Sequence, residues 1–137
     1  MDRIKTLLAA VIVTWPAAAI SEEFPSGIYA ATAELCAAGE RGGLEAIFEE
    51  DAVILTADGF IGMEYSCEFV QILAGKRTPG FIVTALCEEP DMAHPELLAI
   101  MPRSEGELQV TSLTDEVAEQ PSINSGTYVR CEGLTLP

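Results

Sequence analysis

Apolar and polar residues alternate in short runs along most of the chain, as in strands that bury one face. The runs lie at 27–31, 44–49, 52–56, 62–73, 80–88, 97–101, 108–111 and 126–131. Turn-forming segments such as Asp58-Gly59 and Ser104-Glu105-Gly106 separate them. About eight short strands at this spacing predict an all-β fold, a small antiparallel barrel or sandwich.

One short helix interrupts this pattern near the start of the domain. Thr32 can cap its first turn and Gly39 can end it, so we expect one or two helical turns over 32–38. Two polar stretches, 88–95 and 114–125, are expected to be loops. The first and last strands begin with similar sequences, Ser-Gly-Ile-Tyr and Ser-Gly-Thr-Tyr, and we expect these strands to be adjacent.

The runs 62–73 and 80–88 predict a hairpin folded about Arg77, because the segment 75–80 has the composition of a turn. This hairpin places Cys67 opposite Cys87, Phe69 opposite Ala85, Gln71 opposite Val83 and Leu73 opposite Phe81. These positions share one face and most are apolar, so we expect that face to be the interior.

Four cysteines allow three disulfide pairings. The hairpin favours Cys67 with Cys87, and Cys36 would then pair with Cys131 and tie the start of the domain to its end. We interpret both pairs as structural, since the chain has no Cys-x-x-Cys motif and a nucleophilic cysteine would have only one histidine as a base.

The first nineteen residues have the layout of a secretory signal peptide. A short charged start is followed by an apolar run over 6–14, a break at Trp15-Pro16, and Ala17-Ala18-Ala19, which fits an Ala-x-Ala cleavage site. We expect cleavage after Ala19, with Ser21 as the second choice, and a single exported domain over 20–137. The apolar run is shorter than the ~20 residues of a membrane span, so we expect no membrane anchor after cleavage. The expected location is the periplasm or the extracellular space, where disulfides persist.

The chain is strongly acidic, with 22 acidic and seven basic residues and a net charge of −15. This charge argues against nucleic acid and anionic membranes as partners, since both require a basic face. An acidic field attracts basic proteins instead. A basic protein is therefore the expected kind of partner.

The search for chemistry finds no catalytic residue, no metal ligand and no cofactor site. Acidic residues cluster at Glu22-Glu23, at Glu49-Glu50-Asp51, and at Glu88-Glu89 with Asp91. We interpret the clusters as solvated turns. A calcium site and a glycosidase-like carboxylate pair are the alternatives, although no Asp-x-Asp-x-Asp-Gly loop is present.

Other polar and aromatic residues also have ordinary structural interpretations. His94 is expected on the surface of a polar loop, and no Gly-x-Ser-x-Gly motif supplies a nucleophile for it. Tyr29, Tyr65 and Tyr128 are expected in the core or at a barrel rim. Lys76-Arg77 is expected at a solvated hairpin tip, with a contact to an acidic partner as the alternative.

Several of these features together resemble a known type of protein. They are the leader, Gly27-x-Tyr29, the early Cys36, the Cys67-to-Cys87 hairpin and the terminal Tyr128-x-x-Cys131. The chain resembles small exported four-cysteine β proteins of Gram-negative bacteria that have no known activity, over most of its mature length. Its general plan is also similar to small periplasmic protease or lysozyme inhibitors built as β-barrels. No inhibitory motif matches residue by residue, so the resemblance assigns no site.

These observations favour a noncatalytic exported binding domain that presents an acidic surface to another protein. Inhibition of a basic hydrolase is one form that this function could take. A small-ligand carrier is the alternative, because an eight-stranded barrel can hold one small ligand. A hydrolase acting through His94 and the clustered acids is the third hypothesis.

Overall fold

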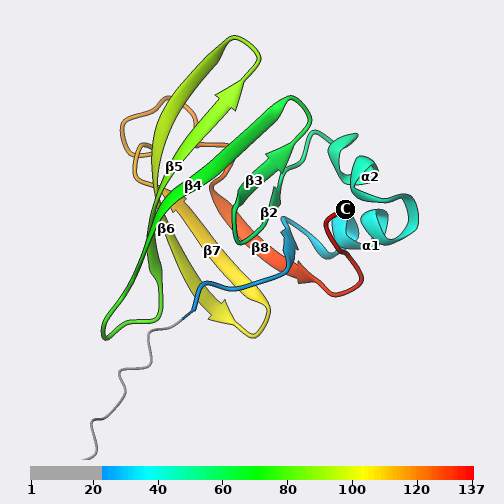
Figure 1. Cartoon of the computed structure of the whole chain (residues 1–137), viewed down its shortest axis with the longest axis horizontal. Helices are drawn as coiled ribbons and strands as arrows, with labels where there is room; N and C mark the ends of the chain where they lie inside the picture. Colours follow the sequence, from blue (N-terminus) through cyan, green and yellow to red (C-terminus); the bar gives the residue numbers. More distant parts are fainter. Residues whose placement is uncertain (1–22) are drawn as a thin grey trace, which may run out of the picture.

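Eight antiparallel strands form a closed barrel in which each strand pairs with the next and β8 pairs with β1 (Figure 1). The structure is a computed structural model that describes residues 23–137. The strands are β1 (Ile28–Ala30), β2 (Ile54–Leu55), β3 (Gly59–Gly62), β4 (Tyr65–Ala74), β5 (Phe81–Glu89), β6 (Met92–Ser104), β7 (Glu107–Ser112) and β8 (Gly126–Cys131). The predicted all-β fold is confirmed, as a barrel, and so is the adjacency of the first and last strands. The predicted signal peptide, both cleavage positions and Glu22 lie outside the described residues.

Two helices, α1 (Ala33–Gly42) and α2 (Leu44–Phe48), connect β1 to β2 and lie on one side of the barrel (Figure 1). Thr32 caps α1 as predicted, and its hydroxyl accepts a hydrogen bond from the Leu35 amide at 3.1 Å. The predicted end at Gly39 is wrong. Gly39 is buried within the helix, where a Cβ would lie 2.8 Å from both Ile47 and Leu134. The helix ends instead at Gly42 and is capped by Gly43, whose φ of 79° favours glycine.

The strand predicted at 44–49 is wrong, because this segment contains α2. Its apolar residues fit both periods, since Leu44, Ile47 and Phe48 also have the i, i+3, i+4 spacing of a helix. In the structure these three side chains pack with Ile28 and Ile54 in a small apolar cluster. Tertiary packing, rather than the local sequence pattern, therefore determines that this segment is a helix and not a strand.

The central hairpin β4–β5 confirms part of the predicted register. Cys67 lies opposite Cys87, and Phe69 lies opposite Ala85. A bulge between Phe69 and Gln71 then adds one residue to β4, so that Leu73 lies opposite Ile82 rather than Phe81. Gln71 likewise lies opposite Thr84 rather than Val83. The predicted interior positions of Gln71 and Leu73 are therefore wrong.

Two other boundaries differ from the sequence-based prediction. The run 62–73 begins at the end of β3, and a turn at Met63-Glu64 separates β3 from β4. The predicted loop 88–95 is wrong, since β5 continues to Glu89, a turn at Pro90-Asp91 follows, and β6 begins at Met92. Pro95 is accommodated because the first part of β6 pairs with β5 alone, and β7 pairs only from Leu98 onward.

Side chains of β5, β6 and β7 alternate between the interior and the surface. The inward-facing side chains of the strands fill the barrel. The largest fully buried ones include Phe60, Leu98 and Ile100, each 0% exposed. The Phe60 ring packs against Phe69 and Tyr128, at centroid distances of 5.6 and 5.7 Å. The interior is thus a packed apolar core.

Both predicted disulfides are confirmed. Cys67–Cys87 crosses β4 and β5 inside the barrel, and Cys36–Cys131 joins α1 to the end of β8. Two disulfides are typical of a protein that works in an oxidising compartment outside the cytoplasm. Within residues 23–137, no helix has the length and apolar character required to cross a membrane.

Candidate functional site

Four polar side chains gather inside one end of the barrel, beside the Cys67–Cys87 disulfide. They are Tyr65, His94, Glu96 and Asn124, here called the polar cluster. His94 and Glu96 face inward because they pair with Cys87 and Ala85 on β5, at the same alternating positions as the core residue Leu98. Tyr65 begins β4, and Asn124 belongs to the loop before β8. Three separate parts of the chain therefore meet here.

Asn124 is the centre of the polar cluster and is 0% exposed. Its side-chain Nδ2 donates hydrogen bonds to Tyr65 Oη at 2.7 Å and to Glu96 Oε2 at 2.6 Å. Its backbone carbonyl accepts a hydrogen bond of 3.1 Å from the Tyr128 hydroxyl. One buried residue thus ties the 113–125 loop to β4 and β6 through its side chain and to β8 through its backbone.

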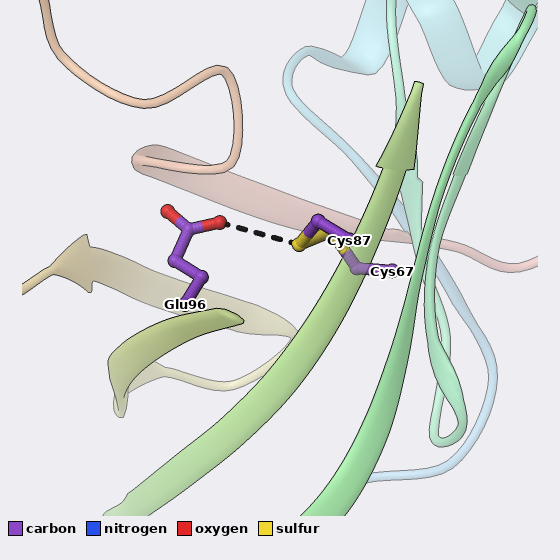
Figure 2. A group of neighbouring side chains, drawn as sticks. All are labelled: Cys67, Cys87 and Glu96. Atoms are coloured by element: carbon purple, nitrogen blue, oxygen red, sulfur yellow. Dashed lines mark hydrogen bonds between the residues drawn. A yellow bond between two sulfur atoms is a disulfide. The ribbon is translucent and has the colours of Figure 1, made fainter. Parts of the chain in front are cut away.

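The disulfide forms one wall of the polar cluster. Figure 2 shows Glu96 extending from β6 toward the sulfur of Cys87, and Glu96 Oε2 lies 3.5 Å from that atom. A disulfide sulfur carries no hydrogen, so Cys87 cannot donate a hydrogen bond to Glu96, and the two atoms are only in contact. Tyr65 Oη lies 3.0 Å from Cys67 Sγ, which can only accept. The disulfide therefore gives the carboxyl group no donor.

Cys67, Cys87 and Glu96 are the one group of three potential metal ligands within metal-binding distances among residues 23–137. Their ligand atoms all lie within 4.8 Å of one another. Metal ions bind the thiolate form of cysteine, whereas both sulfurs here are joined in a disulfide. The oxidised protein therefore does not fit a metal ion at this position.

The polar cluster perturbs the two tyrosines that contact Asn124. Burial raises the pKa of the Tyr65 hydroxyl to about 12, with further contributions from the negative charges of Glu96 and Glu89. The hydrogen bond from Asn124 opposes this shift. Burial also raises the pKa of Tyr128. Both hydroxyls are therefore protonated at neutral pH and remain hydrogen-bond donors.

Three buried polar atoms of the polar cluster have no hydrogen-bond partner. They are Glu96 Oε1, Asn124 Oδ1 and His94 Nδ1. No basic side chain pairs with Glu96, since the one ion pair among residues 23–137 joins Arg130 to Glu132 at 3.8 Å. Buried polar groups are nearly always satisfied in folded proteins, by protein groups, water or a ligand, so these atoms mark the polar cluster as a candidate binding position.

A pocket of about 260 Å³ adjoins the polar cluster. The 113–125 loop forms one wall and β6 forms another. Its lining residues are Tyr65, Glu89, His94, Pro95, Glu96, Thr114, Gln120, Ser122 and Ile123. Asp115 shapes the loop, because its carboxyl group accepts hydrogen bonds from the Ser122 amide at 2.7 Å and from the Ser125 hydroxyl. The pocket is therefore walled by both strand and loop.

A second surface feature is an apolar strip on the outside of β4, β5 and β6. Leu73 and Ile82 lie opposite each other there, and both are exposed. Leu86 and Leu97 lie farther along the same face and are 49% and 40% exposed. The bulge in β4 contributes to this strip, because it turns Leu73 outward.

The candidate residues from the sequence take different positions. The acids at 49–51 and at 88, 89 and 91 are exposed and lie in or beside turns. Lys76-Arg77 is exposed in the β4–β5 loop as predicted. Tyr29 and Tyr128 belong to the core, and Tyr65 lies at its rim. The loop predicted around His94 is wrong, because His94 lies in β6; its side chain is half-buried, with Nδ1 buried.

Sequence reasoning missed Glu96 and Asn124. A signal for Glu96 was present, since positions 94, 96, 98 and 100 continue one alternating face of β6. Asn124 carried no such signal, because it lies in a loop and reaches the barrel only through tertiary folding.

No protein-family model, curated protein or solved structure matches this chain. The functional conclusion therefore rests on the charge, the surfaces and the polar cluster of the chain itself.

Proposed function

We propose that this chain is a noncatalytic binding domain, exported to the periplasm or the extracellular space, that recognises a basic protein. The observation that carries this proposal is an excess of unpaired acidic side chains. Residues 23–137 contain twenty acidic and five basic residues, and they form a single ion pair, Arg130 with Glu132. The remaining negative charge is uncompensated within this part of the chain and is free to attract a basic partner.

The apolar strip on β4–β6 supports binding to a protein rather than to a small solute. Protein interfaces combine an apolar centre with a polar rim. Leu73, Ile82, Leu86 and Leu97 supply exposed apolar area, and the acidic Glu68 lies beside Leu86 in the strand register. Apolar contact and charge attraction are therefore available on the same side of the barrel.

The filled interior favours this proposal over the alternative of a small-ligand carrier. A carrier needs a cavity in the barrel, whereas Phe60, Leu98 and Ile100 occupy the interior and are 0% exposed. An eight-stranded barrel is just wide enough for its own side chains to fill. A surface or a pocket at the barrel end is then the more suitable place for recognition.

The proposed location follows from the two disulfides and from the signal peptide expected at 1–19. The intact mass of the protein from its own cells tests it. We expect a chain that lacks these residues and is lighter by four hydrogens than its reduced form. A full-length, reduced chain would overturn the proposed location.

The binding proposal is tested by capture from an envelope extract at about 0.1 M and about 1 M salt, which shortens the Debye length from about 10 Å to about 3 Å. We expect a basic protein to bind stoichiometrically at low salt and to be released at high salt. The variants E49Q/E50Q/D51N and E88Q/E89Q/D91N each remove three negative charges, and we expect both to weaken capture. D51N suits its position, because asparagine tolerates the φ of 53° found at Asp51. Capture that ignores both salt and these variants would count against the proposal.

A further inference from the structure

Two of the three residues with unpartnered atoms, Glu96 and His94, line the pocket, and Asn124 contacts Glu96 from outside the lining. Glu96 Oε1 and Asn124 Oδ1 are hydrogen-bond acceptors, and His94 Nδ1 is an acceptor in one of its neutral tautomers. Glu96 is 5% exposed and Asn124 is 0% exposed, so water does not reach them freely. The group that would satisfy them is a hydrogen-bond donor with several hydrogens.

The negative charge of Glu96 further limits the class of ligand that suits the pocket. A buried carboxylate is normally paired with a cation, and no Lys or Arg of residues 23–137 forms an ion pair with Glu96. A metal ion does not fit beside the intact disulfide. A primary ammonium group carries one positive charge and three N–H donors, so it can neutralise Glu96 and also donate to neighbouring acceptors.

The size and lining of the pocket suit an ammonium group carried on an aliphatic stem. At about 260 Å³, the pocket is much larger than a single ion requires. Ile123, Pro95 and the ring of Tyr65 supply apolar walls, and Glu89 adds a second, exposed carboxyl group. Lysine buries its methylene stem along apolar surface while its ammonium seeks polar partners.

We propose that this pocket binds the side-chain ammonium of a lysine presented by the basic partner, with Glu96 as its counter-ion. This inference rests on the proposed function and adds the position and chemistry of one contact. Glu96 Oε1 accepts a hydrogen bond from the ammonium. That atom is covered in the free protein, so a side chain that covers it has to move as the lysine enters.

The first test is an NMR titration of the secreted, disulfide-bonded protein. The two probes are Nα-acetyl-lysine amide and Nα-acetyl-norleucine amide, which has a similar stem and no charge. We expect the lysine probe to shift the resonances of His94, Glu96 and Asn124 saturably, and the norleucine probe to leave them unchanged. Equal effects of the two probes would overturn the inference.

Two variants locate the contact. E96Q keeps a carbonyl acceptor for Asn124 but removes the charge, and we expect it to weaken binding of the lysine probe at least tenfold. E105Q is the matched control, because it removes one charge from an exposed position in the β6–β7 turn and Glu105 does not line the pocket. I123W enlarges an exposed side chain that lines the pocket and should also reduce binding. Equal affinities of E96Q and E105Q for the lysine probe would contradict the assignment.

Capture of the basic partner shows whether the lysine pocket and the proposed binding function fail together or independently. If the partner binds in a salt-sensitive manner and E96Q captures it as well as E105Q does, the lysine pocket is wrong and the proposed function stands. If the free lysine probe binds but no basic protein is captured, the source of the ammonium is a free amine. The proposed function and the partner lysine are then both overturned.

Discussion

Asn124 donates a hydrogen bond of 2.6 Å to Glu96, although 28 positions separate the two residues in the sequence. The same amide donates to Tyr65 at 2.7 Å. Asn124, which lies in a loop, thereby fixes the position of the start of β4 relative to the inward face of β6. The shape of the pocket depends on this one side chain.

We predict that Asn124→Ala destabilises the protein by about 2–4 kcal/mol. The substitution removes both hydrogen bonds from a fully buried site and leaves the Glu96 carboxyl without a donor. Urea unfolding followed by circular dichroism measures the loss. Gln109→Ala is the control, since its 3.0 Å hydrogen bond with Thr127 is exposed and its loss should cost less than about 0.5 kcal/mol. Similar unfolding midpoints for the two variants would contradict the anchoring role of Asn124.

Gly59 provides a second test, based on backbone geometry. Its φ is 149°, and a Cβ at this position would lie 1.7 Å from the backbone oxygen of Cys67. We predict that Gly59→Ala costs at least about 3 kcal/mol, because it combines an unfavourable φ with a backbone clash. Gly126→Ala is a matched control, since its φ is 147° but nothing lies within 4 Å of the added Cβ. Thermal unfolding should show a much larger loss for Gly59→Ala, and equal losses would exclude the clash as the cause.

The two disulfides should each contribute measurably to stability. Cys36–Cys131 spans 95 residues and Cys67–Cys87 spans 20, for which the loss of chain entropy in the unfolded state is worth about 4–5 and about 3 kcal/mol. We predict losses of this order for Cys36→Ala with Cys131→Ala, and for Cys67→Ala with Cys87→Ala. Guanidinium unfolding of both double variants measures them. A loss below about 1 kcal/mol for either would show that its disulfide is dispensable.

The raised pKa of Tyr65 predicts a loss of stability in alkaline solution. Above pH 10 the unfolded chain releases the Tyr65 proton, whereas the folded protein retains it until about pH 12. Unfolding then releases a proton, so the free energy of unfolding decreases as the pH rises through this range. Below pH 10 both states are protonated, and the effect is absent.

Tyr65→Phe separates this contribution from that of Tyr128. The free energy of unfolding of the variant should fall less steeply between pH 10 and pH 12 than that of the wild type. Tyrosinate absorbance of the folded proteins gives an independent measure, since the wild type should titrate one more residue at high pH. Parallel pH profiles would contradict the burial of the Tyr65 hydroxyl.

Local patterns predicted most of the barrel and both disulfides. The alternation in 80–88 and 126–131 corresponds to β5 and β8, and the turn at 75–80 places Cys67 opposite Cys87. Such signals work because strand periodicity and turn chemistry depend on neighbouring residues. The bulge after Phe69 gave no local signal, because the extra residue is apparent only against the partner strand.

The polar cluster could not be predicted in the same way. His94 and Glu96 flank Pro95, and proline indicated a loop rather than a strand. Pairing of β6 with β5 overrides that signal, and both side chains then face the interior. Asn124 joins them only when the barrel closes, so the cluster is a product of tertiary structure.

Closure of the barrel has a consequence for how any partner can be recognised. Every strand pairs on both sides over part of its length, because β1 pairs with β2 and with β8, and stretches such as 70–74 of β4 and 92–96 of β6 pair on one side. An extended peptide that binds by adding a strand needs an open sheet edge as its template. Strand addition is therefore limited to those short stretches, and most of the surface can recognise a partner only through side chains and loops. Residues such as Ile123 or Leu86 can change without disturbing the strand pairing that holds the fold.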